Sequence, residues 1–198
     1  MLNKLFAGLA VATFYGVATV DIRADEPVAG DAANGRKLAR MCATCHGRDG
    51  VARIPPAPNI GGEDSAYLAR QLDAFRTGAR VNEMMTVVSK SLSDQQIADL
   101  STWYAGLAPI ATPPAGRGEE GPDLCMACHA ANGISTVEDA PNLAGESDIY
   151  LITQLKNFRS GKRESEIMNE IAADLTDTEI REAAEWYSAI DFKTRKPE

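Results

Sequence analysis

The sequence is poor in histidine, with only His46 and His129 among 198 residues. Two histidines are too few for two metal centres that each bind a pair of histidine ligands, unless another chain contributes ligands. The sequence is also short of positive charge, because 20 Lys and Arg stand against 28 Asp and Glu, a formal net charge of −8. Without a basic cluster, an acidic chain is a poor candidate for binding nucleic acid or anionic lipid.

Long apolar runs are absent beyond MLNKLFAGLAVATFYGVATV (1–20), which places one lysine before an apolar segment that ends near small residues. This arrangement is typical of a secretory signal. We expect residues 1–24 to be removed after Ala24 on export, which takes the four cysteines out of the reducing cytosol. A retained membrane anchor is the alternative, because the run is as long as the shortest membrane spans.

The sequence repeats itself at an offset of 83 residues. APNIGGE (57–63) recurs as APNLAGE (140–146), and YLARQLDAFRTGAR (67–80) recurs as YLITQLKNFRSGKR (150–163), with no gap between these blocks. Two copies of one domain explain the pattern, and the prolines and glycines between the copies suit a linker. The expected parts are a signal peptide (1–24), a first domain (25–107), a linker (108–117) and a second domain (118–198).

Each copy is predicted to be helical. SAYLARQLDAFRTG (65–78) and SDIYLITQLKNFRSG (147–161) carry apolar residues at helical spacing and end at a glycine. SDQQIADLSTWYAGL (93–107) and TDTEIREAAEWYSAI (176–190) open with the capping-box pattern. A short helix is expected before each cysteine pair, starting late in the second copy because of Gly121-Pro122. Because no segment shows convincing strand alternation, the predicted fold class is all-α, and such small domains need something besides side chains to fill them.

The four cysteines fall into two Cys-x-x-Cys-His motifs. This is the attachment pattern of c-type haem, in which two thiols bond to the porphyrin and the adjacent histidine ligates the iron. A thioredoxin-like dithiol would need a strand-helix-strand context, a four-thiolate zinc site would leave the histidines unexplained, and a disulfide within one motif would need an unusually tight loop. We expect two covalently bound haem c groups, held by Cys42, Cys45, Cys125 and Cys128, with His46 and His129 as proximal ligands.

The sixth iron ligand follows largely by elimination. With both histidines used, methionine is the leading candidate, and the methionines beside the cysteine motifs are too close in sequence to reach the other haem face. Met85 and Met168 share one position in the repeat, whereas Met84 falls opposite Ile167, which cannot ligate iron. We therefore expect Met85 and Met168 to be the axial ligands. The alternative is that they are flexible core methionines.

Two further groups of repeated residues could support the haems. Pro58 and Pro141 each lie twelve residues after their histidine, where the proline carbonyl could accept a hydrogen bond from the second ring nitrogen; a simple turn proline is the alternative. Repeated arginines near the methionines could pair with haem propionates or could remain solvated: Arg76, Arg80, Arg159 and Arg163.

The segments CATCHGRDG (42–50), APNIGGEDSAYLARQLDAFRTGARVNEMM (57–85) and LSDQQIADLSTWYAGL (92–107), with their second-half counterparts, resemble the dihaem cytochrome c4 family over nearly all of the chain after the signal. The resemblance implies two class I cytochrome c domains related by an approximate twofold axis, with the haem edges meeting near the domain boundary. It also implies electron transfer in the bacterial periplasm, often to terminal oxidases and often in association with the membrane. The second copy departs from the family pattern at Ala130, where the first has Gly47.

A six-coordinate iron has no open site for a substrate, so we expect a one-electron carrier rather than an enzyme. Its expected partners are periplasmic redox proteins: a terminal oxidase, a quinol-oxidising complex or a dehydrogenase. Residues 25–107 carry a net charge of −1 and residues 108–198 carry −8, which should orient the protein at partner surfaces and lower the potential of the second haem. The alternatives are a cytochrome subunit of a periplasmic dehydrogenase, such as a flavoprotein complex, and a dihaem peroxidase, which would need a displaceable ligand.

Overall fold

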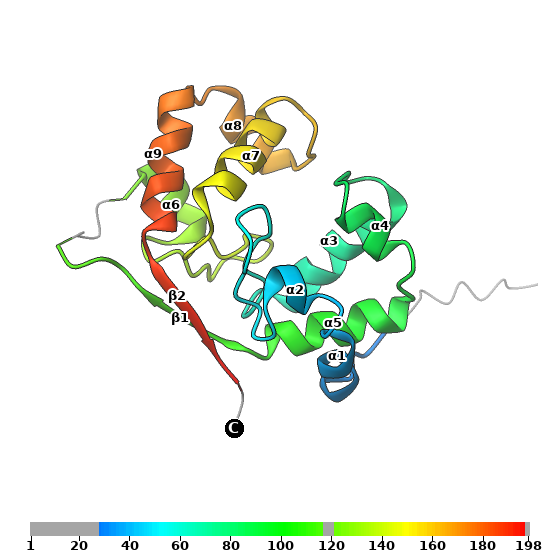
Figure 1. Cartoon of the computed structure of the whole chain (residues 1–198). Coiled ribbons are helices and arrows are strands. Elements are labelled where there is room, and N and C mark those ends of the chain that lie inside the picture. The colour runs from blue at the N-terminus through cyan, green and yellow to red at the C-terminus, as the bar shows by residue number, and fades with distance from the viewer. Residues whose placement is uncertain (1–27, 117–120, 197–198) are drawn as a thin grey trace, which may run out of the picture.

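The structure, a computed structural model, describes residues 28–116 and 121–196, and the expected signal peptide lies outside them. The described chain forms two helical lobes and a two-stranded ribbon (Figure 1). Helices α1 to α5 build the first lobe, and α6 to α9 build the second. The prediction of a mainly helical protein is confirmed in both halves of the repeat.

The first lobe is built on helix α5. Its helices are α1 (Ala32–Leu38), α2 (Ala43–His46), α3 (Ser65–Thr77), α4 (Met85–Ser89) and α5 (Asp94–Ala105). Helix α3 ends at Gly78, whose φ of 87° lies in the left-handed region that glycine tolerates. Helix α5 starts with a complete capping box between Ser93 and Gln96. Helices α1 and α3 pack on α5 and bury the core of the lobe: Ala39, Leu68, Leu92, Ile97, Leu100, Trp103, Tyr104 and Leu107.

The second lobe repeats this plan around helix α9. Its helices are α6 (Asp123–His129), α7 (Asp148–Arg159), α8 (Glu166–Ala173) and α9 (Asp177–Ser188). Helix α6 starts directly after Pro122, and α9 has its own capping box between Thr176 and Glu179. Helix α7 packs on α8 and α9, and the core of the lobe is formed by Ala144, Leu151, Ala184, Tyr187, Ile190 and Phe192.

The ribbon corrects the prediction of an all-helical chain. Strand β1 (Ala108–Thr112) pairs antiparallel with β2 (Asp191–Arg195), so that Ala108 lies opposite Arg195. The expectation of a chain without strands is therefore wrong for residues 108–112 and 191–195. Neither strand shows a clear alternation of apolar residues, because Phe192 alone among these ten residues is buried. Their pairing depends on a partner that is distant in the sequence.

Several contacts join the two lobes beyond the ribbon. The Asn142 side chain donates to the Gly62 carbonyl at 2.9 Å, and the Asn59 side chain donates to the Ala144 carbonyl at 3.2 Å. Both asparagines belong to the repeated Ala-Pro-Asn segments, so the same repeat position ties each lobe to the other. Within residues 28–116 and 121–196, no helix has the length and apolarity needed to span a membrane.

Candidate functional site

A cavity with a volume of about 880 Å³ is lined by residues of both lobes. Its size lies within the range of about 300 to 1,000 Å³ that is typical of cofactor and ligand sites. Apolar side chains from α3 and α7 form much of the wall, including Leu68, Phe75, Leu151 and Phe158. Both cysteine motifs face this cavity: Cys42, Cys45, His46, Cys125, Cys128 and His129.

Both imidazole rings are buried and held by a proline carbonyl. His46 Nδ1 lies 2.8 Å from the Pro58 oxygen, and His129 Nδ1 lies 2.8 Å from the Pro141 oxygen. A carbonyl can only accept, so Nδ1 carries the proton and Nε2 keeps its lone pair for a metal. Burial lowers the pKa of both histidines, while the hydrogen bond to the carbonyl acts in the opposite direction. The neutral ring that burial favours is the form that ligates iron.

The four thiols are free and half-buried at the cavity wall. Burial raises the pKa of the Cys42 thiol and of the Cys125 thiol. A reactive dithiol depends on a lowered pKa, because the thiolate is the nucleophile. The surroundings of Cys42 and Cys125 therefore do not favour thiol-disulfide chemistry.

Met85 and Met168 are half-buried and line the cavity. Their neighbours at the preceding repeat position also line the cavity but are largely exposed, since Met84 is 66% exposed and Ile167 is 63% exposed. Met85 is the first residue of α4 and Met168 the third residue of α8, which are both short helices. Of these residues, Met85 and Met168 are therefore the ones whose side chains the fold shields beside the cavity.

A repeated capping contact fixes the backbone at each methionine. The Asn82 side chain accepts from the Met85 amide at 3.0 Å, and the Ser165 hydroxyl accepts from the Met168 amide at 3.3 Å. Asn82 and Ser165 occupy equivalent positions, three residues before each methionine. Neither residue was predicted from the sequence, although a capping residue at this spacing was the available signal.

The four repeated arginines have two different roles. Arg76 bonds the Leu92 carbonyl and pairs with Asp94, and Arg159 makes the equivalent contacts to Leu175 and Asp177. These two side chains tie α3 to the start of α5 and α7 to the start of α9, and they are not among the residues that line the cavity. The expectation that Arg76 and Arg159 could face haem propionates is corrected by this geometry, because their donors are used between helices.

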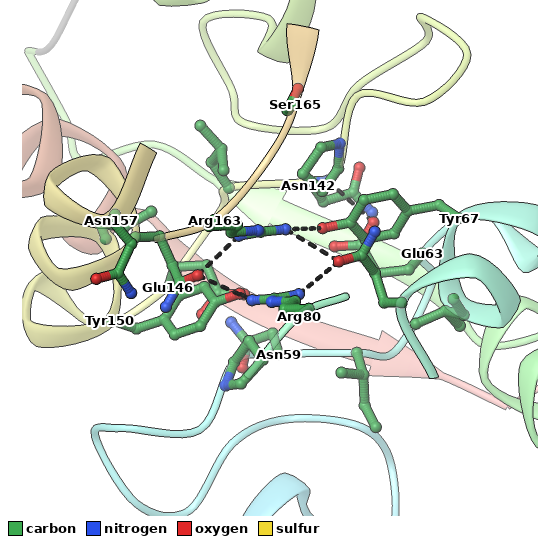
Figure 2. Close-up of a pocket in the computed structure, with 18 of the residues that line it drawn as sticks. Asn59, Glu63, Tyr67, Arg80, Asn142, Glu146, Tyr150, Asn157, Arg163 and Ser165 are labelled. Carbon is green, nitrogen blue, oxygen red and sulfur yellow. Dashed lines mark hydrogen bonds between the residues drawn. The ribbon is translucent and has the colours of Figure 1, made fainter. Parts of the chain in front are cut away.

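Arg80 and Arg163, in contrast, line the cavity where the lobes meet (Figure 2). Arg80 donates to Gln154 at 2.8 Å and to the Tyr150 hydroxyl at 3.4 Å, while Arg163 donates to the Tyr67 hydroxyl at 3.1 Å. Each arginine therefore reaches from its own lobe into the other. Among the described residues neither forms an ion pair, so two cations face the cavity without a carboxylate partner.

These features fit the covalent haem that the motifs predict. Each half of the cavity offers two thiols, an imidazole with a free Nε2 and a thioether, all at an apolar wall. The two unpaired guanidinium groups suit the carboxylates of haem propionates. A buried Ser101 hydroxyl without a protein partner also faces this space.

Comparison with known proteins gives a consistent result. The family model "Cytochrome c" matches residues 32–107. The chain is 32% identical to cytochrome c4 of Pseudomonas aeruginosa, over 90% of this chain and 94% of that protein. It is 33% identical to the thiosulfate dehydrogenase electron acceptor of Thiomonas intermedia, over 80% of this chain and 82% of that protein. The solved structure of cytochrome c4 from Pseudomonas stutzeri has a TM-score of 0.73 at 27% identity and covers 82% of this chain and 100% of that one.

Proposed function

Since the chain belongs to the cytochrome c4 family, we propose that His46 and Met85 ligate one haem iron and that His129 and Met168 ligate the other. The family membership makes the chain a dihaem c-type electron carrier with covalently bound haem c. The observation that supports this ligand set is its repetition: each half of one cavity presents a carbonyl-held histidine and a half-buried methionine at equivalent positions.

When bound, each haem supplies a one-electron iron couple. His46 and Met85, and their counterparts, would hold each iron and leave no position for a substrate, so the bound group would supply outer-sphere one-electron transfer. A methionine ligand would raise the potential relative to a second histidine. The apolar wall from α3 and α7 would exclude water from the bound group, and the cysteines would hold it covalently.

We propose a periplasmic role in which the protein carries two electrons, one per domain, between respiratory-chain donors and a terminal oxidase or reductase. The uneven charge, −1 for residues 25–107 and −8 for residues 108–198, would orient the protein at a partner surface. The negative charge of the second domain also favours the ferric state there, so its haem should have the lower potential.

Replacing each methionine separately tests the ligands. Met85→Ala and Met168→Ala should each remove half of the weak long-wavelength methionine-to-iron band of the ferric protein and lower the potential of one haem. Met84→Ala is the matched control and should leave the band and both potentials unchanged. A pyridine haemochrome count of two c-type haems in every variant shows that attachment is intact.

The outcome also assigns the potentials. The haem that changes in Met168→Ala should be the one with the lower potential in the unmodified protein, and the opposite order would contradict the charge argument. An unchanged band in Met85→Ala would contradict the ligand assignment. Carbon monoxide binding to the reduced, unmodified protein would contradict six-coordination and favour an enzyme.

A second candidate role is that of a dedicated acceptor for one dehydrogenase. The similarity to a thiosulfate dehydrogenase electron acceptor, over 82% of that protein, favours it. Both roles use the same haem sites, so the partner decides between them. Purification from the native source should yield a stably bound dehydrogenase subunit if this role applies, and the free dihaem protein if the general carrier role applies.

A further inference from the structure

Two buried carboxyl groups lie where the lobes meet. Glu63 and Glu146 occupy the same repeat position, are 5% and 3% exposed, and line the same cavity. Figure 2 shows both glutamates close to the tyrosines and arginines that join the lobes. Neither glutamate was predicted as a site from the sequence, although both repeated segments, APNIGGE (57–63) and APNLAGE (140–146), end in Glu.

Each carboxyl group is held by the backbone of the other lobe. Glu63 Oε2 accepts from the Asn142 amide at 3.0 Å, and Glu146 receives a hydrogen bond from the Asn59 amide. The second oxygen of Glu146, Oε2, is buried and has no hydrogen-bond partner. In the part of the chain that the structure describes, neither glutamate forms an ion pair. A buried carboxylate with so few donors is costly in its charged form.

The nearby charged groups do not relieve this cost. The Arg80 and Arg163 guanidinium groups donate to Gln71, Gln154 and the tyrosine hydroxyls instead. Among the other titratable groups, Asp64 acts on Glu63. Tyr67 is affected by the Glu63 charge and by Tyr150 of α7. Desolvation raises the pKa of Glu63 to about 8. The hydrogen bond from Asn142 acts to lower this pKa, and the charge of Asp64 raises it by a smaller amount. Desolvation also raises the pKa of Glu146, and the Glu63 charge raises it further.

We propose that Glu63 and Glu146 form a redox-linked proton site, which binds a proton when the haems are reduced and releases it when they are oxidised. The proposal rests on the electron-transfer role above and goes beyond it, because it couples the uptake of a proton to the uptake of an electron. Reduction by a one-electron donor removes one positive charge from a haem iron beside the same cavity. A carboxylate of the pair then takes a proton from water and forms one O–H bond, and oxidation by the acceptor reverses both events.

The arrangement favours coupling for two reasons. Charges interact more strongly in a region of low dielectric constant, and both carboxyl groups are buried in the wall of the cavity that would hold the haems. Two neighbouring carboxylates also disfavour each other's ionisation, so the pair gains its first proton readily. The coupled sites titrate as a unit rather than as two independent residues.

Potentiometric titration of the holoprotein across pH 5 to 9 tests the proposal. In the unmodified protein, the potential of at least one haem should fall as pH rises, approaching about 59 mV per tenfold fall in proton concentration for fully coupled one-electron transfer. The double variant Glu63→Gln, Glu146→Gln keeps the shape and the hydrogen-bond acceptors but cannot titrate, so its potentials should not depend on pH in this window. Glu138→Gln, which changes an exposed carboxylate that lines the same cavity, is the control and should retain the slope.

Direct proton counting provides a second readout. Reduction in weakly buffered solution with a pH indicator should show proton uptake in the unmodified protein and in Glu138→Gln, and a loss of that uptake in the double variant. The redox-difference infrared spectrum should show a carboxylic acid C=O band that each single Gln variant changes. A slope or proton uptake that persists in the double variant assigns the effect to other groups, such as haem propionates, and overturns the proposal.

A pH-independent potential in the unmodified protein overturns it as well. Failure of the carrier role looks different, since the optical spectrum would then lack two reducible c-type haems. Loss of the proton site alone leaves both haems fully reducible. The single variants Glu63→Gln and Glu146→Gln cover the case in which the double variant does not fold, and each should reduce the slope.

Discussion

At the scale of the residue, the repeat conserves backbone shape even where it changes the amino acid. Gly47 follows the first histidine with φ 71° and ψ 164°, and Ala130 follows the second with φ 56° and ψ 161°. This region of φ and ψ is almost restricted to glycine, and another residue there stores about 1 to 3 kcal/mol of strain. The second copy therefore keeps the same turn after its histidine but places a strained residue, Ala130, where the first copy has glycine.

Replacing Ala130 with glycine should stabilise the second lobe. The relieved strain exceeds the roughly 0.4 to 1 kcal/mol that glycine adds to the entropy of the unfolded chain, so we expect a gain of about 1 kcal/mol in the free energy of unfolding. Thermal unfolding of the holoprotein measures it. Gly47→Ala is the matched reverse change and should destabilise the protein, because its Cβ would lie 2.2 Å from the Val51 oxygen. A lower melting temperature for Ala130→Gly would contradict this account.

At the scale of the element, helix α1 depends on one buried carboxylate. Asp99 of α5 is 1% exposed and accepts hydrogen bonds from the Asp31 amide at 2.7 Å, the Asn34 side chain at 2.6 Å and the Gln95 side chain at 2.8 Å. These bonds, with that from Asp31 first, lower the pKa of Asp99. Its contribution to stability is therefore present above the unfolded pKa and lost as pH falls through the folded pKa.

Asp99→Ala should destabilise the first lobe by about 1 to 3 kcal/mol, because it leaves part-buried donors at the start of α1 without an acceptor. Chemical denaturation at neutral pH measures the loss. The equivalent position in the second lobe is the exposed Glu182, and Glu182→Ala should change the free energy of unfolding by less than about 0.5 kcal/mol. Equal effects of the two substitutions would contradict a specific role for Asp99.

At the scale of the whole molecule, the buried glutamates should make the stability depend on pH. The folded-state pKa of Glu63, about 8, lies above its ordinary value of 4.5. The folded state thus binds the proton more tightly than the unfolded state, so the stabilisation is complete below the unfolded pKa and is lost as pH rises through about 8.

The melting temperature of the oxidised holoprotein should therefore fall between pH 5.5 and pH 8.5. Glu63→Gln should keep the packing of the unmodified protein and show a smaller fall in melting temperature. The variant should therefore be more stable than the unmodified protein at pH 8.5. Thermal unfolding followed by circular dichroism at both pH values measures this difference, with Glu138→Gln as the control. The same fall in Glu63→Gln as in the unmodified chain would assign the pH dependence to other groups.

The sequence by itself determined the features that depend on near neighbours. The two cysteine motifs and the capping boxes at Ser93 and Thr176 are local patterns, and helix starts are set by side chains within one turn. The offset of 83 residues is also visible in the sequence alone, because it needs only a comparison of the chain with itself. The choice of Met85 over Met84 also came from the register of the repeat, and it remains a prediction although the exposure of Met84 agrees with it.

Only the tertiary structure decided which partners the repeated residues contact and which of them are buried. Strand β1 pairs with a strand some 80 residues away. Arg76 forms an ion pair with α5, whereas Arg80 donates to α7 of the other lobe. Glu63 is buried against the backbone of the other lobe. A repeat pattern cannot predict these outcomes, because burial and hydrogen-bond partners depend on which surfaces of the two copies meet. The same physical cause, desolvation where the lobes meet, turns two ordinary glutamates into the proposed proton site.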